Sequence, residues 1–517
     1  MIQFEKSMAY CTIDMNFDET NLSIYYKNNS SHKSIKNKIT DDEILITRAI
    51  DKILRPYIYL MNCNMSVNIL LLDRGNSELY ISALSAIFCV RYLFPIDTGI
   101  SIINTNQYSS TINQHIDKIQ SSLFISGNKD LITSIQCFTK PMNIDNIYNY
   151  IIKALDECEK IKNILLNINS IYNFTTIESK RVIINTDNFE EYNNKILLKY
   201  NNNIPESIRQ SINRYFANNG RYNNMTDKNI REININKYQN HTVFLRGETS
   251  CMGSYIIHEG NKNFTIQYHF YKFSTKSFKQ PSPRREIGHG AIIENTLFNL
   301  ISNRNVPLRI NCDILSSNGS SSMASICCAG IILYQLGLLD KIISGISVGL
   351  FRNSNKYRIV SDITGIEDQY SDMDCKISSN IDGITSIYMD TKSPIPSSIL
   401  LKILKLGYKS NLQIINHIEQ YAKNDTLVLD IENIGFIIGT NGTVINQITK
   451  ITDCDIKIYG NTVLINHQGN IENGDLCIKL INTYNIGNIK NINKNSELYI
   501  LHKDNKKIHN HVLDCDE

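Results

Sequence analysis

Two stretches of this sequence recur in the same order later in the chain. The segment 41–54 resembles 284–301, at an offset of 243 residues, and the segment 76–89 resembles 318–331, at an offset of 242. Two similarities at nearly the same offset are harder to explain by chance than either alone. The sequence therefore predicts that one fold occurs twice.

Each copy is predicted to be an α/β domain. Strand-like apolar runs such as 67–72 and 264–271 alternate with helix-length apolar patterns. Because single hydrophobic cores stop growing at roughly 250–300 residues, a chain of 517 residues should hold several domains. We place the copies at 1–165 and 220–422, joined by a small helical linker at 166–219.

Composition excludes some classes of protein without selecting one. There are 53 Lys and Arg against 50 Asp and Glu, a net charge of +3, so bulk charge does not indicate nucleic-acid binding. The thirteen cysteines include no C-x-x-C spacing and are interpreted as core residues in a reducing cytosol. The N-terminus lacks a signal-peptide core, and the most apolar stretch, 323–339, is too short to span a membrane and should be a buried helix. We expect a cytoplasmic protein with no membrane partner.

The second copy carries three polar clusters that the first lacks. The first cluster is SPRREIGHG at 282–290, which contains Arg284, Arg285 and His289. Two adjacent arginines before a helix offer planar, paired donors to a phosphate group. The alternative is two surface arginines beside a structural histidine, and this segment alone does not separate the two.

The second cluster is a Gly/Ser loop that leads into the apolar helix. Ser320, Ser321 and Ser322 follow Gly319. Free backbone N–H groups, hydroxyls and the positive end of the helix dipole favour an anion at such a loop. An ordinary helix cap needs only one serine, so three favour anion binding. No Gly-Lys-Ser/Thr follows the glycine, which excludes a Walker loop.

The third cluster is acidic and occupies 361–377. If its end is a strand, Asp372, Asp374 and Lys376 share one face. Clustered carboxylates suit Mg²⁺ or Mn²⁺, and a neighbouring lysine can stabilise charge on a transferring phosphoryl group. The alternative is a solvated acidic loop. Taken together, an anion pocket, paired arginines and a cation site favour phosphoryl transfer, and no Ser-His-Asp or Cys-His arrangement is visible.

A fourth cluster lies past residue 421, where the pattern of apolar and polar residues changes. A G-x-x-G turn stands between two helical patterns at Gly439, Thr440, Asn441 and Gly442. KH modules use such a turn to clamp single-stranded nucleic acid, whereas the alternative is a helical hairpin with glycine caps. We predict a KH domain at 425–468 without a third helix, and a truncated β-barrel at 471–517.

With these motifs in place, the chain resembles the polynucleotide phosphorylase family, in which two RNase-PH-type cores precede KH and OB-fold domains. The similarity is closest at the four clusters and weaker over 246–250 and 41–56. It implies processive 3′-to-5′ phosphorolysis of single-stranded RNA in mRNA degradation: inorganic phosphate attacks the terminal phosphodiester and releases nucleoside diphosphates. It also implies a homotrimer with a central pore, a structural first core and a catalytic second core.

The resemblance assigns phosphate-binding roles to residues of the first two clusters. Ser321 and Ser322, beside Ser320, would hold the attacking phosphate and the scissile group together with Arg284 and Arg285. His289 would then shape the phosphate or ribose site.

The resemblance also assigns the residues that would bind a cation. Asp368 and Asp374 would bind Mg²⁺, with Mn²⁺ as a possible substitute, and Lys376 would stabilise the transition state. Protein partners such as a helicase or an endoribonuclease are not identifiable from the sequence.

The departures from the family fall on RNA-binding parts. The family's pore loop has an aromatic–arginine pair, whereas this chain has Lys33, Lys36 and Lys38, which keep positive charge but offer no stacking ring. The KH turn has Thr-Asn where a lysine is usual. Lower RNA affinity and weaker processivity are therefore expected.

Three rivals remain open at this stage. A catalytically decayed RNA-binding scaffold would not need the intact second-copy clusters. A hydrolytic 3′-to-5′ exoribonuclease would release monophosphates and would not need the serine-rich anion loop. A glycosyltransferase would use Asp372-Met373-Asp374 as its D-x-D motif, but nothing else in the sequence supports a nucleotide-sugar site.

Overall fold

The protein is described by a computed structural model. It describes residues 2–4, 7–16, 21–28, 41–61, 64–73, 78–104, 121–167, 170, 184, 188–200, 204–223, 225–238, 241–257, 264–275, 283–301, 307–354, 356–422, 426–431, 433–467, 469–485, 497–501 and 508–512. The chain divides into two compact units, one built from most of residues 1–422 and the other mainly from residues 423–517.

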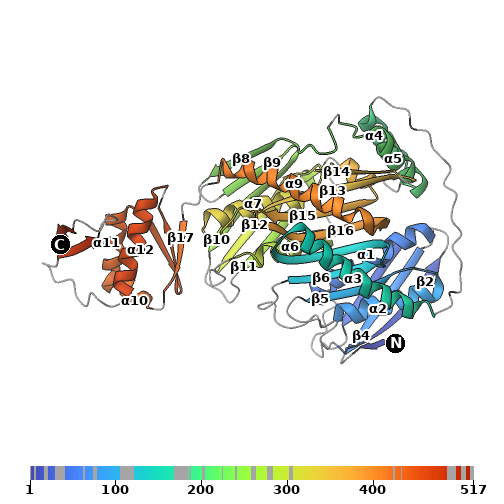
Figure 1. Ribbon diagram of the computed structural model, residues 1–517, viewed down its shortest axis with the longest axis horizontal. Helices are drawn as coiled ribbons and strands as arrows, with labels where there is room; N and C mark the ends of the chain where they lie inside the picture. The colour runs from blue at the N-terminus through green and yellow to red at the C-terminus, as the bar shows by residue number, and fades with distance from the viewer. Residues whose placement is uncertain are drawn as a thin grey trace. The chain divides into compact units, whose positions relative to one another are not determined.

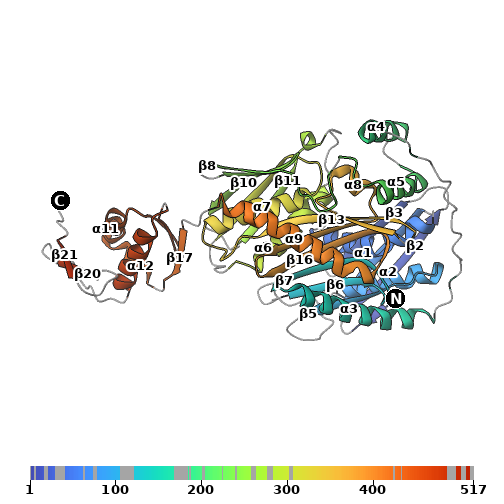
Figure 2. The same cartoon turned by 45° about the horizontal axis from the view of Figure 1, so that its top comes forward.

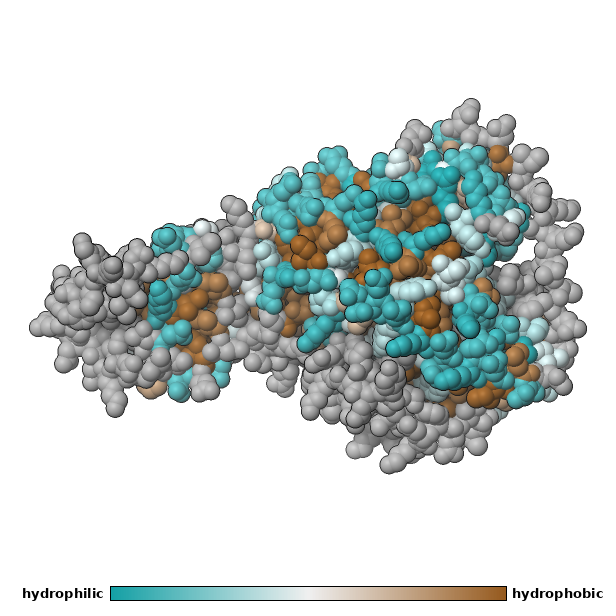
Figure 3. Space-filling view, in the orientation of Figure 1, coloured by the Kyte–Doolittle hydropathy of each residue, from teal (hydrophilic) through white to brown (hydrophobic). Residues whose placement is uncertain are grey.

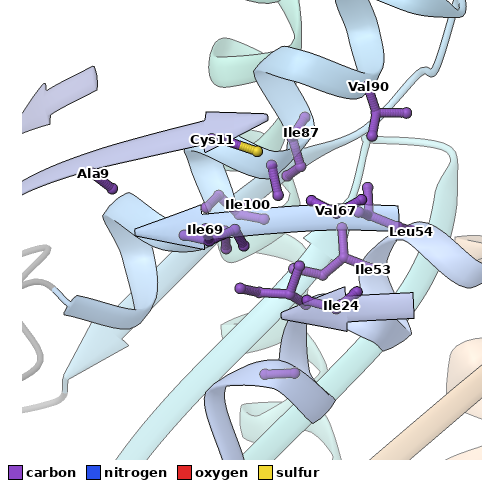
Figure 4. Packing of buried hydrophobic residues seen from close by; sticks show 14 of the residues in the cluster. Ala9, Cys11, Ile24, Ile53, Leu54, Val67, Ile69, Ile87, Val90 and Ile100 are labelled. Carbon is purple, nitrogen blue, oxygen red and sulfur yellow. The ribbon is translucent and has the colours of Figure 1, made fainter. Parts of the chain in front are cut away.

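The first core of the larger unit has, among its described residues, a four-stranded sheet and three helices. Its elements in chain order are β1 (Ile2–Phe4), β2 (Ser7–Asn16), β3 (Asn21–Asn28), α1 (Asp41–Met61), β4 (Asn64–Asp73), α2 (Glu78–Leu93), β5 (Gly99–Asn104), β6 (Ser121–Gly127), β7 (Leu131–Met142) and α3 (Ile144–Leu165). The sheet has the order β1-β2-β4-β3. Figure 4 shows apolar side chains of α1 (Ile53, Leu54) and α2 (Ile87, Val90) gathered with those of the strands, and all are buried.

The second core has a five-stranded sheet with the order β11-β12-β10-β9-β8. Its elements are β8 (Ile233–Tyr238), β9 (His241–Arg246), β10 (Thr249–Ile257), β11 (Phe264–Phe270), η2 (Lys272–Ser274), α6 (Pro283–Phe298), β12 (Leu308–Ser316), α7 (Ser321–Gln335), β13 (Ser344–Asn353), β14 (Lys356–Ser361), α8 (Gly365–Tyr370), β15 (Met373–Asn380), β16 (Gly383–Pro396), η3 (Ser397–Ile399) and α9 (Leu400–Glu419). The apolar helix α7 is buried from Ser321 to Leu333.

The order of elements repeats between the two cores. The two pairs of similar sequence segments form α1 and α6, and α2 and α7. In the first core β4 runs antiparallel to β2 and parallel to β3. In the second core β12 runs antiparallel to β10 and parallel to β11. The same strand–helix pattern therefore occurs twice.

A shared sheet joins the cores. It has seven strands in the order β14-β13-β15-β16-β7-β6-β5, and β16 of the second core pairs antiparallel with β7 of the first. Helix α1 of the first core also lies beside α6 of the second (Figure 1). First-core side chains on α1 can therefore reach the polar clusters of the second core.

The linker contains two helices, α4 (Phe189–Lys199) and α5 (Glu206–Asn219). Figure 2 shows α5 beside α8 of the second core. Phe189 packs its ring 4.8 Å from that of Phe216, which in turn lies 5.1 Å from Phe351 of β13. The linker is thus packed onto the second core.

The smaller unit has a three-stranded sheet of order β17-β19-β18 and three α-helices among the residues described. Its elements are β17 (Thr426–Asp430), α10 (Ile434–Ile438), η4 (Thr440–Gly442), α11 (Thr443–Thr452), β18 (Asp455–Tyr459), β19 (Thr462–Asn466), α12 (Ile471–Asn485), β20 (Glu497–Leu501) and β21 (Ile508–Val512).

Helix α12 corrects two predictions. No third helix was expected after β19, and the stretch from residue 471 was assigned to barrel strands. Instead Cys477, Leu480 and Ile481 recur at helical spacing and are buried against the other helices, while the side chain of Asn470 accepts a hydrogen bond from the backbone N–H of Asn473. Past α12, only the antiparallel pair β20 and β21 is described.

Several general expectations are confirmed. The fold is mixed α/β, and the described cysteines are free and all buried except Cys89. Among the described residues, no helix is both long and apolar enough to cross a bilayer. On the face shown in Figure 3, hydrophobic residues (brown) form separate areas divided by hydrophilic residues (teal).

Candidate active site

The first turn of α6 contains both arginines of SPRREIGHG, because the helix begins at Pro283. Arg285 stacks its guanidinium 4.0 Å from the ring centre of Phe270, and its Nε is buried without a hydrogen-bond partner. Arg284 is exposed, and its backbone carbonyl accepts a hydrogen bond from Arg48 of α1 at 3.2 Å. The two arginines therefore do not form a matched pair: Arg285 points inward and Arg284 lies at the surface.

His289 lies one turn further along α6 and is held neutral. Its ring centre lies 5.2 Å from that of Tyr268, and its Nδ1 is buried without a hydrogen-bond partner. Burial lowers the pKa of His289 well below its usual range, and the positive charges of Arg285, Lys376, Arg48 and Lys52 act in the same direction. Arg285 lies on α6, Lys376 on β15, and Arg48 and Lys52 on α1, so charges from three elements act on this imidazole.

The Gly/Ser loop lies at the N-terminus of α7, as predicted. Gly319 has φ +103°, and a Cβ there would lie 2.3 Å from the carbonyl oxygen of Ile363, so the position requires glycine. The hydroxyls of Ser320 and Ser322 are buried and have no hydrogen-bond partner, whereas Ser321 shares a 2.7 Å hydrogen bond with the Tyr268 hydroxyl. Unpartnered buried donors at a helix N-terminus are the features that an anion would satisfy.

Two strands of the shared sheet bring carboxylates together. Asp374 of β15 lies directly opposite Asp390 of β16, and its Oδ1 is buried without a hydrogen-bond partner. Lys376 forms an ion pair with the other oxygen of Asp374. Burial raises the pKa of Asp374 to about 6, with Lys376 opposing the rise and Asp368 adding to it.

The first core supplies a lysine to this carboxylate cluster. Lys52 of α1 forms a 2.6 Å ion pair with Asp390, and its ammonium lies 3.5 Å from the ring centre of Tyr388. Helix α1 contacts α6 at Gly288, where a Cβ would lie 2.4 Å from Nε of Arg48, so the Arg48 guanidinium packs against this glycine. Sequence reasoning missed Lys52, Arg48 and Asp390, because nothing local marks residues that meet through the shared sheet.

Two other acids of 361–377, Asp372 and Glu367, do not belong to the carboxylate cluster. Asp372, expected on the face of Asp374, precedes β15 and is buried between Arg209 (3.3 Å) and Arg352 (3.2 Å). Glu367 is fully buried and pairs with Arg221 at 2.6 Å. These carboxylates find arginine partners that no local pattern predicts, which corrects the expectation of one continuous acidic site.

Comparison with known proteins gives two domain matches. A model of the RNase PH family, described as the 3′ exoribonuclease family, domain 1, matches residues 246–338, and a KH-domain model matches residues 424–483. The polyribonucleotide nucleotidyltransferase of Thermotoga petrophila is 34% identical over 273 residues, which cover 46% of this chain and 38% of the relative. That of Buchnera aphidicola subsp. Cinara cedri is 28% identical over 534 residues, which cover 86% of this chain and 76% of the relative.

This chain is a homologue of the polyribonucleotide nucleotidyltransferases. It contains an RNase PH domain and a KH domain, and in the first alignment it spans 38% of the relative's length. A solved structure of rice (Oryza sativa) Rrp46 aligns with a TM-score of 0.33 at 11% identity, covering 38% of this chain and 98% of that one, a likeness too weak to carry an argument.

The KH match includes α12 and so extends beyond the boundary predicted for this domain. The G-x-x-G turn joins α10 to α11, and three of its residues have positive φ: Gly439 (+69°), Asn441 (+56°) and Gly442 (+78°). Thr440 and Asn441 are exposed at its tip. Lys33, Lys36 and Lys38 lie outside the residues that the structure describes.

The carboxylate cluster fits a Mg²⁺ site that a substrate would complete. Within the described ranges, no group of three or more His, Cys, Asp or Glu could hold a metal ion without further ligands. Asp374 nevertheless offers a buried oxygen without a hydrogen-bond partner, and Asp368 is close enough to raise its pKa. Mg²⁺ commonly takes one or two carboxylates and completes its shell with waters and substrate phosphates.

The linker holds the turn that precedes Asp374. Arg209 of α5 donates to the carbonyl oxygens of Tyr370 and Ser371 and to Oδ1 of Asp372, each at 3.3 Å. If the chain turns over RNA as its relatives' name implies, Arg209→Leu should lower kcat about 10- to 100-fold while KM changes little, because displacing a reacting group by about 1 Å can cost 10²-fold. Initial rates over a range of RNA concentrations test this, with circular dichroism to show that the variant is folded.

Lys195→Leu is the control for Arg209→Leu. It removes a linker cation whose pairing with Glu191 is solvent-exposed. A normal kcat in Arg209→Leu would show that the linker does not position the carboxylates.

Proposed function

We propose that the chain is a polynucleotide phosphorylase, a Mg²⁺-dependent enzyme that degrades single-stranded RNA processively from the 3′ end. The observation that carries the proposal is that the second core holds both buried donors without hydrogen-bond partners, at Ser322 and Arg285, and a carboxylate oxygen without a partner, at Asp374. Donors for an anion together with carboxylates for a cation are the requirements of phosphoryl transfer.

Different residues have different roles in the proposed reaction. Ser320 and Ser322, with the α7 N-terminus and Arg285, bind the attacking phosphate. An oxygen of that phosphate forms a bond to the terminal phosphorus as the bond to the preceding 3′-oxygen breaks. The products are a nucleoside diphosphate and an RNA one nucleotide shorter.

The carboxylates supply the second part of the proposed site. Asp368 and Asp374 would hold Mg²⁺, which supplies neutralising charge to phosphoryl oxygens when bound. Burial alone would lower the pKa of Lys376, but Asp374 and Asp390 raise it, so the ammonium stays charged and can stabilise the transition state. Neutral His289 can accept or donate a hydrogen bond to the phosphate or ribose without adding charge.

One experiment separates this reaction from its rivals. The full chain is incubated with 5′-labelled single-stranded RNA and Mg²⁺, with and without inorganic phosphate, and the mononucleotide product is identified. Nucleoside diphosphates that form only with phosphate support the proposal. Monophosphates would favour the hydrolytic exoribonuclease, and no turnover would favour the RNA-binding scaffold.

The assembly and location are further parts of the proposal and follow from the family resemblance. We propose a cytoplasmic homotrimer in which RNA passes through a central pore. Light scattering coupled to gel filtration tests the trimer, since a monomeric mass at micromolar concentration would contradict it.

The KH turn is proposed to bind RNA backbone. Asn441→Asp is expected to weaken binding of a 30-mer RNA about fivefold, because a new negative charge about 4 Å from a phosphate costs about 1 kcal/mol in water. Asparagine and aspartate both tolerate the left-handed backbone of this position, so the fold should not change. Filter binding measures the affinity.

Asn461→Asp is the matched control for the KH turn. It makes the same chemical change at another exposed turn of the domain, between β18 and β19. Equal affinities for the two variants would contradict RNA binding at the G-x-x-G turn.

A further inference from the structure

Two aromatic rings are exposed just beyond the end of β11. Tyr271 and Phe273 stack with ring centres 5.1 Å apart and planes 8° from parallel. Phe273 remains 57% exposed and Tyr271 39%. Exposing large rings to water is unfavourable, and this pair is not used by the proposed chemistry. We call Tyr271 and Phe273 the aromatic pair.

The aromatic pair is held rigidly. The Tyr271 hydroxyl donates to Oδ1 of Asp313 at 2.7 Å, and the same oxygen lies 3.0 Å from Nδ1 of His269. The Tyr271 backbone is fixed to Ser274 by hydrogen bonds in both directions, at 3.1 Å each. A rigid aromatic surface loses little conformational entropy when a ligand stacks on it.

The residues on either side of the aromatic pair in the sequence contact segments of the proposed phosphate site. On one side Phe270, the residue before Tyr271, carries the stacked guanidinium of Arg285. On the other side the carbonyl of Ser274 accepts a hydrogen bond from the backbone N–H of Ser317 at 2.8 Å, at the start of the loop that contains Ser320 and Ser322. The segment 270–274, which carries the aromatic pair, therefore contacts both segments that would bind phosphate, through Phe270 and through Ser274.

We propose that the aromatic pair is a stacking platform for a base of single-stranded RNA near its 3′ end. This inference rests on the proposed function for the identity of the ligand. Lys272, which lies between Tyr271 and Phe273 in the sequence, is exposed and adds positive charge to this segment. Aromatic surfaces beside cations are typical of sites that bind single strands without sequence preference. The platform supplies, in the second core, a stacking surface of the kind that the Lys33–Lys38 segment lacks.

The test uses 2-aminopurine, whose fluorescence falls when it stacks on an aromatic ring. A series of 12-mer RNAs carries it at each of the last six positions in turn, and each is bound to the full chain in EDTA without phosphate. We expect quenching at one or two adjacent positions. Phe273→Leu should abolish this quenching and weaken binding about tenfold, whereas Phe273→Tyr should preserve both.

Tyr92→Leu is the control, since Tyr92 is 52% exposed on α2 of the first core. Position-specific quenching that Phe273→Leu abolishes and Tyr92→Leu preserves supports the platform whether or not nucleoside diphosphates form, so failure of the proposed reaction would show separately. No quenching with the unsubstituted chain, or the same quenching with Phe273→Leu, overturns the platform even if diphosphates form. In that case the rings would contact protein instead.

Discussion

Replacing Asp374 with asparagine is expected to abolish RNA turnover, lowering the rate at least about a thousandfold, while RNA affinity changes less than twofold. Asparagine has the same shape as aspartate but lacks the negative charge that a divalent cation and Lys376 require. Removing one group that stabilises transition-state charge in a buried site commonly costs 10²–10³-fold, and here the cation site and the partner of Lys376 are lost together. Our proposals place most RNA contacts at the KH turn and the aromatic pair, so RNA affinity should change little.

Two measurements check this expectation. Single-turnover degradation of 5′-labelled RNA gives the rate, and Mn²⁺ electron paramagnetic resonance gives the fraction of bound cation, which should fall in Asp374→Asn. Because the pKa of Asp374 is about 6, a cation must displace a proton below that pH, so cation affinity of the unsubstituted chain should decrease as pH falls through 6.

Asp382→Asn is the matched control. Asp382 lies in the turn of the same β15–β16 hairpin, and its pair with Lys341 is about half exposed. Its substitution should leave the rate unchanged. Degradation at the normal rate by Asp374→Asn would show that the metal assignment is wrong.

Candidate site residues could be identified from the sequence where they are neighbours in the chain. The serines before α7 could be recognised because a Gly/Ser loop and the apolar helix that follows it are adjacent in the sequence. The stretch around Asp374 could be recognised for the same reason. In both cases the local pattern fixes the backbone, and the backbone fixes the direction of the side chains.

Residues that meet through tertiary structure were not predictable. Lys52 reaches Asp390 because β16 pairs with β7 and α1 packs against β16. Asp372 and Asp374 look equivalent in the sequence, but Arg209, 163 residues before Asp372, makes one of them structural. Sequence spacing contains no information on such partners.

The segment that forms α12 was mispredicted for a different reason: its local sequence is compatible with both strands and a helix. The segment that forms α12 includes Gly474 and several asparagines, which indicate turns between short strands. Its apolar residues nevertheless bury one helical face against α10 and α11. Burial of that face outweighs the weak helix propensity of glycine, which costs about 1 kcal/mol.

Asp362→Asn is expected to cause the largest loss of stability, about 3–5 kcal/mol, because it leaves buried arginines without their counter-charge. Asp362 is fully buried with φ +50°, and its Oδ1 lies 2.8 Å from Arg231 and 2.9 Å from Arg246. Arg246 is itself fully buried. Arg231 also donates to the carbonyl oxygen of Asn318 at 2.6 Å, so this ion-pair network supports the loop that contains the serines proposed to bind phosphate.

The same carboxylate determines how stability depends on pH. Burial alone would raise the pKa of Asp362, but Arg246 and Arg231 hold it well below its usual value near 4. A lowered pKa in the folded state means that the unfolded chain binds protons first, so stability is fully present above about pH 5 and decreases as pH falls. Asp362→Asn should therefore lose less stability on acidification than the unsubstituted chain.

Urea unfolding of the full chain at pH 7 and pH 3 measures both effects, with Asp382→Asn as the control. The exposed Lys341–Asp382 pair should contribute less than about 1 kcal/mol at either pH. The buried network differs because neither arginine can recover its lost partner from water. A midpoint for Asp362→Asn equal to that of Asp382→Asn would mean that solvent reaches Arg246 and that the network is not the support of the phosphate loop.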